Sequence, residues 1–278
     1  MPVPLAPVRT LLIMSLARRR LLTLLAAGGV GTLAGCTGGS PIGPPSEKSS
    51  CVARVSLDAH DAIGSGGLVY DISGEPMDFW FDAGFYGQLE RWLDLLTQES
   101  GLDPDQIWTF GSWIDGGSEC DSWHDSGRAF DLARLQRGGD VQMSCRYDIW
   151  KTYDGERQNF FRRRDWAVAA SLHHEFAYVL TYLYNEQHEN HIHIDNGRSG
   201  SDRSTFSPRS SAQVQAVQAI CRHLWDGDVE ITGRFDRATR RAANAVLDQL
   251  ELGGDLDDGD EQWRGFLLGS VRRGFAER

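Results

Sequence analysis

The sequence predicts an α+β fold in which helices flank a sheet, followed by a small helical module at the C-terminal end. Three segments support this prediction: a helical repeat of apolar residues between positions 85 and 96, a strand-like run between 107 and 114, and an alternating segment between 191 and 195. Apolar residues that recur every three or four positions indicate an amphipathic helix, whereas strict alternation indicates a half-buried strand. Both kinds of element therefore occur within one stretch of chain.

The first predicted helix follows Gly84, and Gly101-Leu102-Asp103-Pro104 ends it, because glycine and proline stop helices. Its apolar stripe consists of Phe85, Leu89, Trp92, Leu93 and Leu96. The run from Ile107 to Ile114 is rich in aromatic and branched residues, so we predict a strand there.

A second helix is predicted from Trp166 to Tyr184. Its apolar stripe consists of Val168, Leu172, Phe176, Val179 and Leu183. His173 and His174 fall on this helix, and we expect them on its surface. Tryptophans are mostly core residues, but Trp123 is placed where it could line a substrate groove.

Two segments contain residue types that commonly bind metals. The first runs from Ser122 to Asp131 and contains His124, and the second runs from His188 to Asp195. Side chains alternate along a strand, so His191, His193 and Asp195 share one face, opposite Ile192 and Ile194. A single histidine is more often a hydrogen-bonded core or surface residue, whereas the joint pattern predicts a metal site. A catalytic zinc ion takes three such ligands and keeps an open position.

The pattern Ser-x-His-x-x-Gly-x-Ala-x-Asp, followed by His-x-x-His-x-His, resembles the zinc D-alanyl-D-alanine peptidases, a group that includes lysostaphin-type enzymes and the hedgehog signalling domain. The run from Tyr184 to Asp195 is most similar to the extensin-like C-terminal domain branch. The resemblance covers about residues 51–200. It implies an antiparallel sheet with flanking helices and a zinc cleft.

The resemblance also implies roles for individual residues. His124, Asp131 and His193 would bind zinc, and His191 would lie beside the metal-bound water as a base or as a stabiliser of the oxyanion. His188 would support His191 by a hydrogen bond. Asp195 would support His193 or would be a solvated strand end, and Ser122 would hold the motif loop by hydrogen bonds.

One feature departs from the family. Its members that remove a terminal D-alanine carry an arginine on the strand before the first motif, where it grips the substrate carboxylate. Residues 107–115 contain no arginine. Arg128 is a possible substitute, although an exposed arginine is the simpler interpretation. Endopeptidase activity is therefore expected rather than carboxypeptidase activity.

Residues 1–36 have the features of an export signal with a lipoprotein cleavage box, in which Cys36 would be lipidated. The paired arginines before the apolar run are typical of twin-arginine signals. A plain signal peptide or an uncleaved anchor is the alternative, and Met14 could be the start. Residues 37–50 are rich in Gly, Pro and Ser and are predicted to be a flexible tether. The expected location is the extracytoplasmic face of the cell membrane, with a lipid anchor.

Charge and cysteine content fit this location. Without residues 1–35 the chain has 24 basic and 39 acidic residues, a net charge of −15, which argues against nucleic acid as a partner. Four cysteines remain besides Cys36, and disulfides are expected in an oxidising compartment. Cys120 and Cys145 flank the first motif, so their pairing is favoured, with Cys51 to Cys221 as the weaker second pair. Free buried thiols or a metal-ligating cysteine are the alternatives.

Residues 201–211 are predicted to be a linker, and residues 212–278 a helical domain. The run from Gly233 to Ala242 resembles the signature of the three-helix peptidoglycan-binding domain, in which Asp236 would cap a helix. The acidic stretch 254–260 lacks the spacing of an EF-hand and is expected to be a solvated loop.

Together the two resemblances predict an exported zinc metallopeptidase that acts on cell-wall peptidoglycan peptides. Its partners would be peptidoglycan or another cell-surface peptide, and the membrane through the lipid anchor. The alternatives are a non-catalytic, zinc-stabilised binding protein, as the hedgehog domain illustrates, and an extracellular peptidase with a different substrate.

Overall fold

The computed structural model describes residues 51–114 and 120–276. The predicted signal peptide with Cys36 and the predicted tether 37–50 lie outside the described residues. Within the described part, no helix has the length and apolar character needed to cross a membrane.

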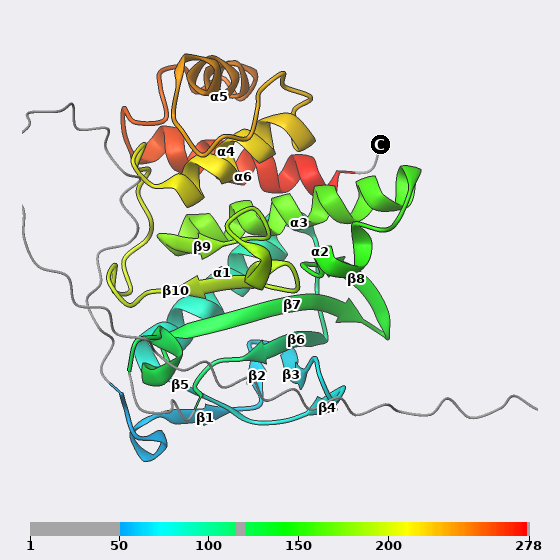
Figure 1. Cartoon of the computed structure of the whole chain (residues 1–278), viewed down its shortest axis with the longest axis vertical. Coiled ribbons are helices and arrows are strands. Elements are labelled where there is room, and N and C mark those ends of the chain that lie inside the picture. The colour runs from blue at the N-terminus through cyan, green and yellow to red at the C-terminus, as the bar shows by residue number, and fades with distance from the viewer. Residues whose placement is uncertain (1–50, 115–119, 277–278) are drawn as a thin grey trace, which may run out of the picture. The chain divides into compact units, whose positions relative to one another are not determined.

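The centre of the fold is an eight-stranded mixed sheet (Figure 1), in which all pairs are antiparallel except β3 with β6. Along the sheet the order is β2 (Ala62–Ile63), β3 (Gly66–Tyr70), β6 (Gln106–Gly111), β7 (Ala129–Arg137), β10 (Ile192–Asp195) and β9 (Tyr178–Leu180). Strand β4 (Glu75–Pro76) pairs with β3, and β8 (Asp140–Ser144) pairs with β7. A separate ribbon is formed by β1 (Asp58–His60) and β5 (Phe79–Phe81). The predicted α+β class is confirmed.

Six α-helices lie in the described residues: α1 (Ala83–Ser100), α2 (Tyr147–Trp150), α3 (Gly155–Glu175), α4 (Ser211–Leu224), α5 (Arg237–Gln249) and α6 (Asp260–Phe275). Short 3-10 turns are η1 (Arg54–Ser56), η2 (Trp123–Ser126) and η3 (Glu186–His188). Helix α1 confirms the first predicted helix. Asp82 Oδ1 accepts a hydrogen bond from Phe85 N at 3.1 Å at its start, and Gly101, with φ +72°, ends it.

Helices α1 and α3 cover one face of the sheet. Trp92 of α1 donates to Ser171 Oγ of α3 at 2.9 Å, and both residues are fully buried. The apolar side chains of β7 and β10 point into this core; they are Phe130, Leu132, Ile192 and Ile194. Because side chains alternate along a strand, Asp131 and His193 point to the opposite face.

The predicted second helix is wrong at both ends. Helix α3 starts at Gly155 rather than Trp166, and it ends at Glu175 because Phe176 adopts an extended conformation with φ −115° and ψ 133°. The apolar continuation instead forms β9, where Val179 pairs with Ile194 of β10. The apolar residues of this segment have helical spacing, but they pair with the edge of the sheet. The local pattern therefore did not decide the secondary structure here.

The predicted Cys120–Cys145 disulfide and the weaker predicted pair, Cys51–Cys221, are also wrong. Cys120 is bonded to Cys51, with the two Cα atoms 5.0 Å apart, while Cys145 and Cys221 are free and buried. The reason is the register of the β7–β8 pair, which places Ser144 opposite Arg134. Arg134 is five residues further along β7 than Ala129, where the motif loop enters the strand, and five strand residues span roughly 17 Å. Cys145, next to Ser144, is therefore far from the motif loop.

The C-terminal helices pack against α3 and share its hydrophobic core. A Cβ atom added at Gly274 of α6 would come within 2.4 Å of Ala167 Cβ, so these helices touch closely. Asp236 caps α5, as expected, by accepting from Thr239 N at 2.8 Å. Arg240 pairs with Asp255 and Asp257 of the acidic stretch. The proposed boundary at residues 201–211 remains a prediction.

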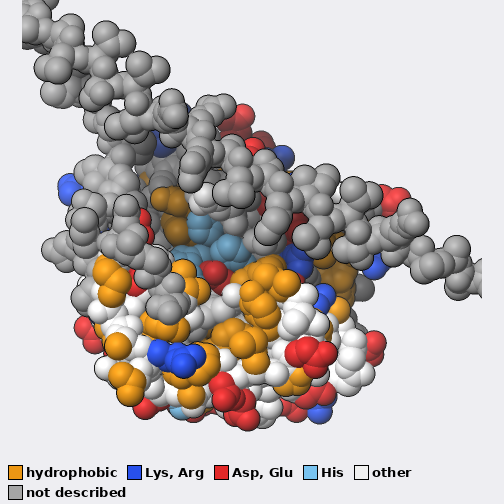
Figure 2. All heavy atoms as spheres, turned by 60° about the horizontal axis from the view of Figure 1, so that its bottom comes forward, with side chains coloured by type: hydrophobic (Ala, Val, Ile, Leu, Met, Phe, Trp, Pro, Cys, Tyr) orange, Lys and Arg blue, Asp and Glu red, His pale blue; other side chains and the backbone are white. Residues whose placement is uncertain are grey.

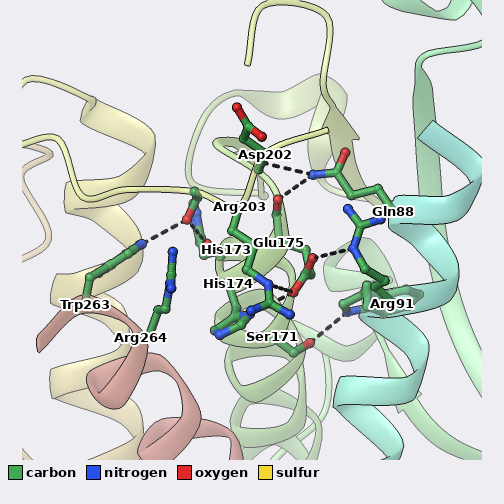
Figure 3. Close-up of polar contacts among 12 residues, drawn as sticks. Gln88, Arg91, Ser171, His173, His174, Glu175, Asp202, Arg203, Trp263 and Arg264 are labelled. Atoms are coloured by element: carbon green, nitrogen blue, oxygen red, sulfur yellow. Dashed lines mark hydrogen bonds and ion pairs between the residues drawn. The ribbon is translucent and has the colours of Figure 1, made fainter. Parts of the chain in front are cut away.

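His173 and His174 are buried, which corrects their predicted place on a helix surface. Figure 3 shows them at the end of α3, among polar residues of α1, α6 and the following loop. His174 Nδ1 lies 2.9 Å from Glu175 Oε1, and Arg203 donates to the same oxygen at 3.1 Å. Within the part of the chain that the structure describes, neither ring nitrogen of His173 has a hydrogen-bond partner.

The burial of His173 predicts an acid-sensitive fold. Burial lowers the pKa of His173 to about 3. The neighbouring groups are Trp263 and Arg264 of α6, and His174, Glu175 and Arg203 (Figure 3). As the pH falls from about 6.5 towards 3, the unfolded chain gains a proton on this residue that the folded chain does not, so stability falls.

His173→Leu removes this titrating group. The slope of the unfolding free energy against pH should therefore be smaller in the variant by up to about 1.4 kcal/mol per pH unit, the value for one proton, below pH 6.5. Urea denaturation of wild type and variant across this range measures the two slopes. Equal slopes would show that His173 takes up its proton in the folded state.

Candidate metal centre

The two motif segments meet through the pairing of β7 with β10. In this antiparallel pair His193 lies directly opposite Asp131, so both side chains stand on the same face of the sheet. His124 reaches this face from η2, which begins with a capping box formed by Ser122 and Asp125. Gly127, with φ +66°, ends η2 and turns the chain into β7.

Three candidate ligand atoms form a compact triangle. Asp131 Oδ1 is 2.9 Å from His193 Nδ1 and 3.3 Å from His124 Nε2, and the two histidine nitrogens are 3.3 Å apart. In a tetrahedral zinc site with bonds of 2.0–2.1 Å, neighbouring ligand atoms are about 3.3 Å apart. His124, Asp131 and His193 could therefore hold a metal ion, as the sequence predicted.

The orientation of His124 is set by the backbone. Its Nδ1 lies 2.5 Å from the carbonyl oxygen of Ser112, which can only accept a hydrogen bond. In the neutral ring the proton is therefore on Nδ1, and the Nε2 lone pair points at Asp131 and His193. Metal-binding histidines are commonly fixed in this way by an acceptor behind the ring.

The charge distribution of the triangle suits a cation. Burial acts to raise the pKa of Asp131. The positive charges of His124 and His193, when protonated, and their hydrogen bonds to the carboxylate outweigh burial and hold that pKa well below its usual range. Burial acts to lower the pKa of His193, but its contacts with Asp131 and Asp195 raise it to about 9. Asp131 therefore carries a negative charge between two imidazoles, and a metal ion that binds there would displace the proton of His193.

His191 lies next to the triangle, with its Nε2 3.4 Å from Asp131 Oδ1. Its Nδ1 is 2.7 Å from Asn190 Oδ1, and this contact leaves the Nε2 lone pair directed at the site. The ring of Phe110 lies behind it, with the two centroids 5.9 Å apart. Burial lowers the pKa of His191, which favours the neutral imidazole.

The two supporting residues take different positions. Asp195 Oδ2 is 3.5 Å from His193 Nε2, on the side of the ring away from the triangle. His188 lies beside His191, with ring centroids 5.2 Å apart, but its Nδ1 contacts Asn185 Oδ1 at 2.7 Å. The hydrogen-bonding role that we expected of His188 towards His191 is filled by Asn190.

The site opens to solvent on one face. Figure 2 shows histidine side chains and an acidic side chain in a hollow, with hydrophobic side chains beside it. The three triangle residues and His191 each keep 11–17% of their side-chain surface exposed. A ligand can therefore reach the triangle from this face.

No family model, curated protein or solved structure matches this chain.

The motif residues Arg128 and Trp123 are held by structural contacts. Arg128 donates from Nε and Nη2 to Asn196 Oδ1 and O at 3.0 and 2.8 Å, and its guanidinium lies 5.5 Å from the Trp123 ring. Trp123 also lies against Gly197, where an added Cβ would be 1.9 Å from the ring. Neither side chain is directed freely towards a substrate.

Several residues of the site were not predicted. Ser112 acts through its carbonyl oxygen, which any residue type carries, so no sequence pattern reveals it. Asn190 lies between the motif residues His188 and His191, and this position in the sequence could have indicated its role in the site. Asn196 joins Arg128 to Gln88 of α1, whose Oε1 accepts from Asn196 Nδ2 at 3.0 Å.

Proposed function

We propose that this chain is an exported zinc metallopeptidase that hydrolyses peptides of cell-wall peptidoglycan. The triangle of His124, Asp131 and His193 with His191 at its side carries this proposal. Two imidazoles and a carboxylate with an open position are a donor set of catalytic zinc sites. The proposal includes a fold like that of the zinc D-alanyl-D-alanine peptidases and a lipid anchor at Cys36 on the extracytoplasmic face.

Zinc held by the triangle would act as a Lewis acid that polarises the scissile carbonyl and activates water. The chain's own residues would manage the proton. His191 Nε2 has its lone pair towards the site, because Nδ1–H donates to Asn190. It would accept a proton from the attacking water and return it to the leaving amine when the peptide bond breaks.

An internal peptide bond is the better substrate candidate. Strand β6 carries no arginine, and Arg128 already bonds Asn196. Arg146, 5.5 Å from the Phe110 ring, is paired with Asp71 and Asp148. These arginines are committed to other contacts, which supports a substrate without a free terminal carboxylate.

Metal analysis tests the ligand assignment. After zinc loading and dialysis, wild type should hold an equimolar amount of metal, and His124→Ala and His193→Ala should lower the affinity by more than about 100-fold, because removing a ligand costs more than removing an outer contact. His188→Ala is the matched control, since it removes a nearby imidazole outside the triangle, and it should keep the metal. Full metal content in His193→Ala would refute the assignment.

Activity on purified peptidoglycan fragments, followed by mass spectrometry, tests the reaction. His191→Ala should keep zinc but lower the cleavage rate by about 10²–10⁴-fold. Zinc-loaded wild type that binds the fragments saturably without cleaving them would instead favour the non-catalytic binding protein.

A further inference from the structure

A second site lies away from the triangle, at the junction of α3, α4 and α6. A pocket of about 810 Å³ opens there, within the usual range of small-molecule pockets. Its wall includes Arg162 and Arg164 of α3, Arg222 and His223 of α4, and Phe275 of α6. Three helices that are distant in sequence thus supply one concave surface.

The pocket is basic in an acidic protein. Four arginines line it, Arg162, Arg163, Arg164 and Arg222, against the two carboxylates of Glu156 and Asp226. The whole chain has a net charge of −11, so the charge of the pocket lining is opposite in sign to the net charge of the protein. Clefts lined by one sign of charge concentrate ligands of the opposite sign.

Two of these guanidinium groups are available for an anion. Arg162 donates to the neutral side-chain oxygens of Asn159, at 3.0 Å, and of Gln158. Arg222 is exposed at the pocket. The ion pairs found among residues 51–114 and 120–276 include neither Arg162 nor Arg222.

His223 lines the same pocket as Arg162 and Arg222. His223 stands close enough to both that, after burial, their repulsion contributes to lowering its pKa to about 4. His223 is therefore neutral at physiological pH, when one ring nitrogen donates a hydrogen bond and the other accepts one. A bound anion would meet two cations and a neutral donor.

Arg164 contacts the apolar part of the wall. The Arg164 guanidinium lies 4.2 Å from the Phe160 ring and 5.3 Å from the Phe275 ring, and it donates to the carbonyl oxygen of Gln142 at 2.6 Å. Phe160 keeps 40% of its surface exposed at the pocket. An apolar group attached to the anion would find contact area there.

We propose that this pocket binds an organic phosphate, with its phosphate group between Arg162 and Arg222 and its apolar part against Phe160. Guanidinium groups bind phosphate oxygens in paired, charge-assisted hydrogen bonds, and two of them match a dianion better than a single carboxylate. The phosphate belongs either to a soluble phosphate ester or to the headgroup of an anionic phospholipid.

Calorimetric titration of the full chain with phenyl phosphate and with inorganic phosphate tests the proposal. Phenyl phosphate should bind saturably and more tightly than inorganic phosphate. Arg162→Gln/Arg222→Gln should weaken its binding by at least about tenfold. Arg241→Gln, which removes an exposed arginine of α5 outside the pocket, is the matched control and should bind like wild type.

Sedimentation with phosphatidylglycerol vesicles, against phosphatidylcholine vesicles, separates the two sources. Binding to the anionic vesicles that is lost in the double variant identifies a lipid headgroup, and binding to phenyl phosphate alone identifies a soluble ester. No saturable binding of any probe, or equal binding by wild type and the double variant with an unchanged urea midpoint, would overturn the proposal.

Discussion

Breaking the Cys51–Cys120 disulfide is expected to lower the free energy of unfolding by about 4 kcal/mol, because the bond closes a loop with a sequence separation of 69 residues. The bond holds the start of the described chain against the loop that leads into Ser122 and η2. Its loss should therefore also loosen the loop that presents His124. Urea denaturation of wild type with and without a reductant measures the change in stability.

Cys51→Ser/Cys120→Ser is the matched control for this experiment. Its unfolding midpoint should be lowered to that of reduced wild type and should not respond to the reductant. Peptide mapping without reduction should recover Cys51 joined to Cys120. A peptide that joins Cys120 to Cys145 would contradict the structure.

Trp263→Ala is expected to destabilise the fold by about 4 kcal/mol, since truncation of a buried tryptophan leaves a large cavity. Trp263 is fully buried and packs against Phe206 and Phe266, with ring centroids 5.1 and 6.4 Å away. It also donates to Ser204 Oγ at 2.9 Å (Figure 3), and thereby joins α6 to the segment between β10 and α4. Urea or thermal denaturation gives the magnitude.

Trp263→Phe reduces the loss of packing, because it keeps an aromatic ring in the core while removing the indole N–H and part of the ring volume. It should cost about 1–2 kcal/mol, the scale of one buried hydrogen bond with some loss of packing. A Trp263→Ala variant as stable as wild type would show that α6 does not depend on this contact. Unfolding of α4–α6 in a separate, earlier transition would support the predicted domain boundary at 201–211.

The candidate ligands could be predicted because their information is local. The alternation of His191, Ile192, His193 and Ile194 fixes which side chains share a face, whatever the neighbouring strand is. The pairing of His193 with Asp131 could not be predicted in the same way, since register depends on two segments about sixty residues apart. Alternation placed His191 and His193 on one face, and the resemblance of the two motifs to a known family implied which residues would be ligands.

The errors arise where tertiary contacts outweighed sequence neighbourhood. Cys145 is close in sequence to the motif, but the length of β7 carries it to the other end of the sheet. Val179 continues the apolar spacing of α3, yet its segment pairs with β10. His173 has the polar character of a surface residue and is covered by α6, which lies about ninety residues further along the chain.

The contact between Trp123 and Gly197 has a consequence for the evolution of this protein. A side chain of any size at position 197 would overlap the indole ring, so the two positions are expected to change together. Chains descended from a common ancestor should keep tryptophan opposite glycine, or should exchange both for a smaller ring and a larger residue. This pair of positions, rather than the candidate ligands alone, would distinguish true relatives from chains that acquired a similar His-Asp-His triad independently.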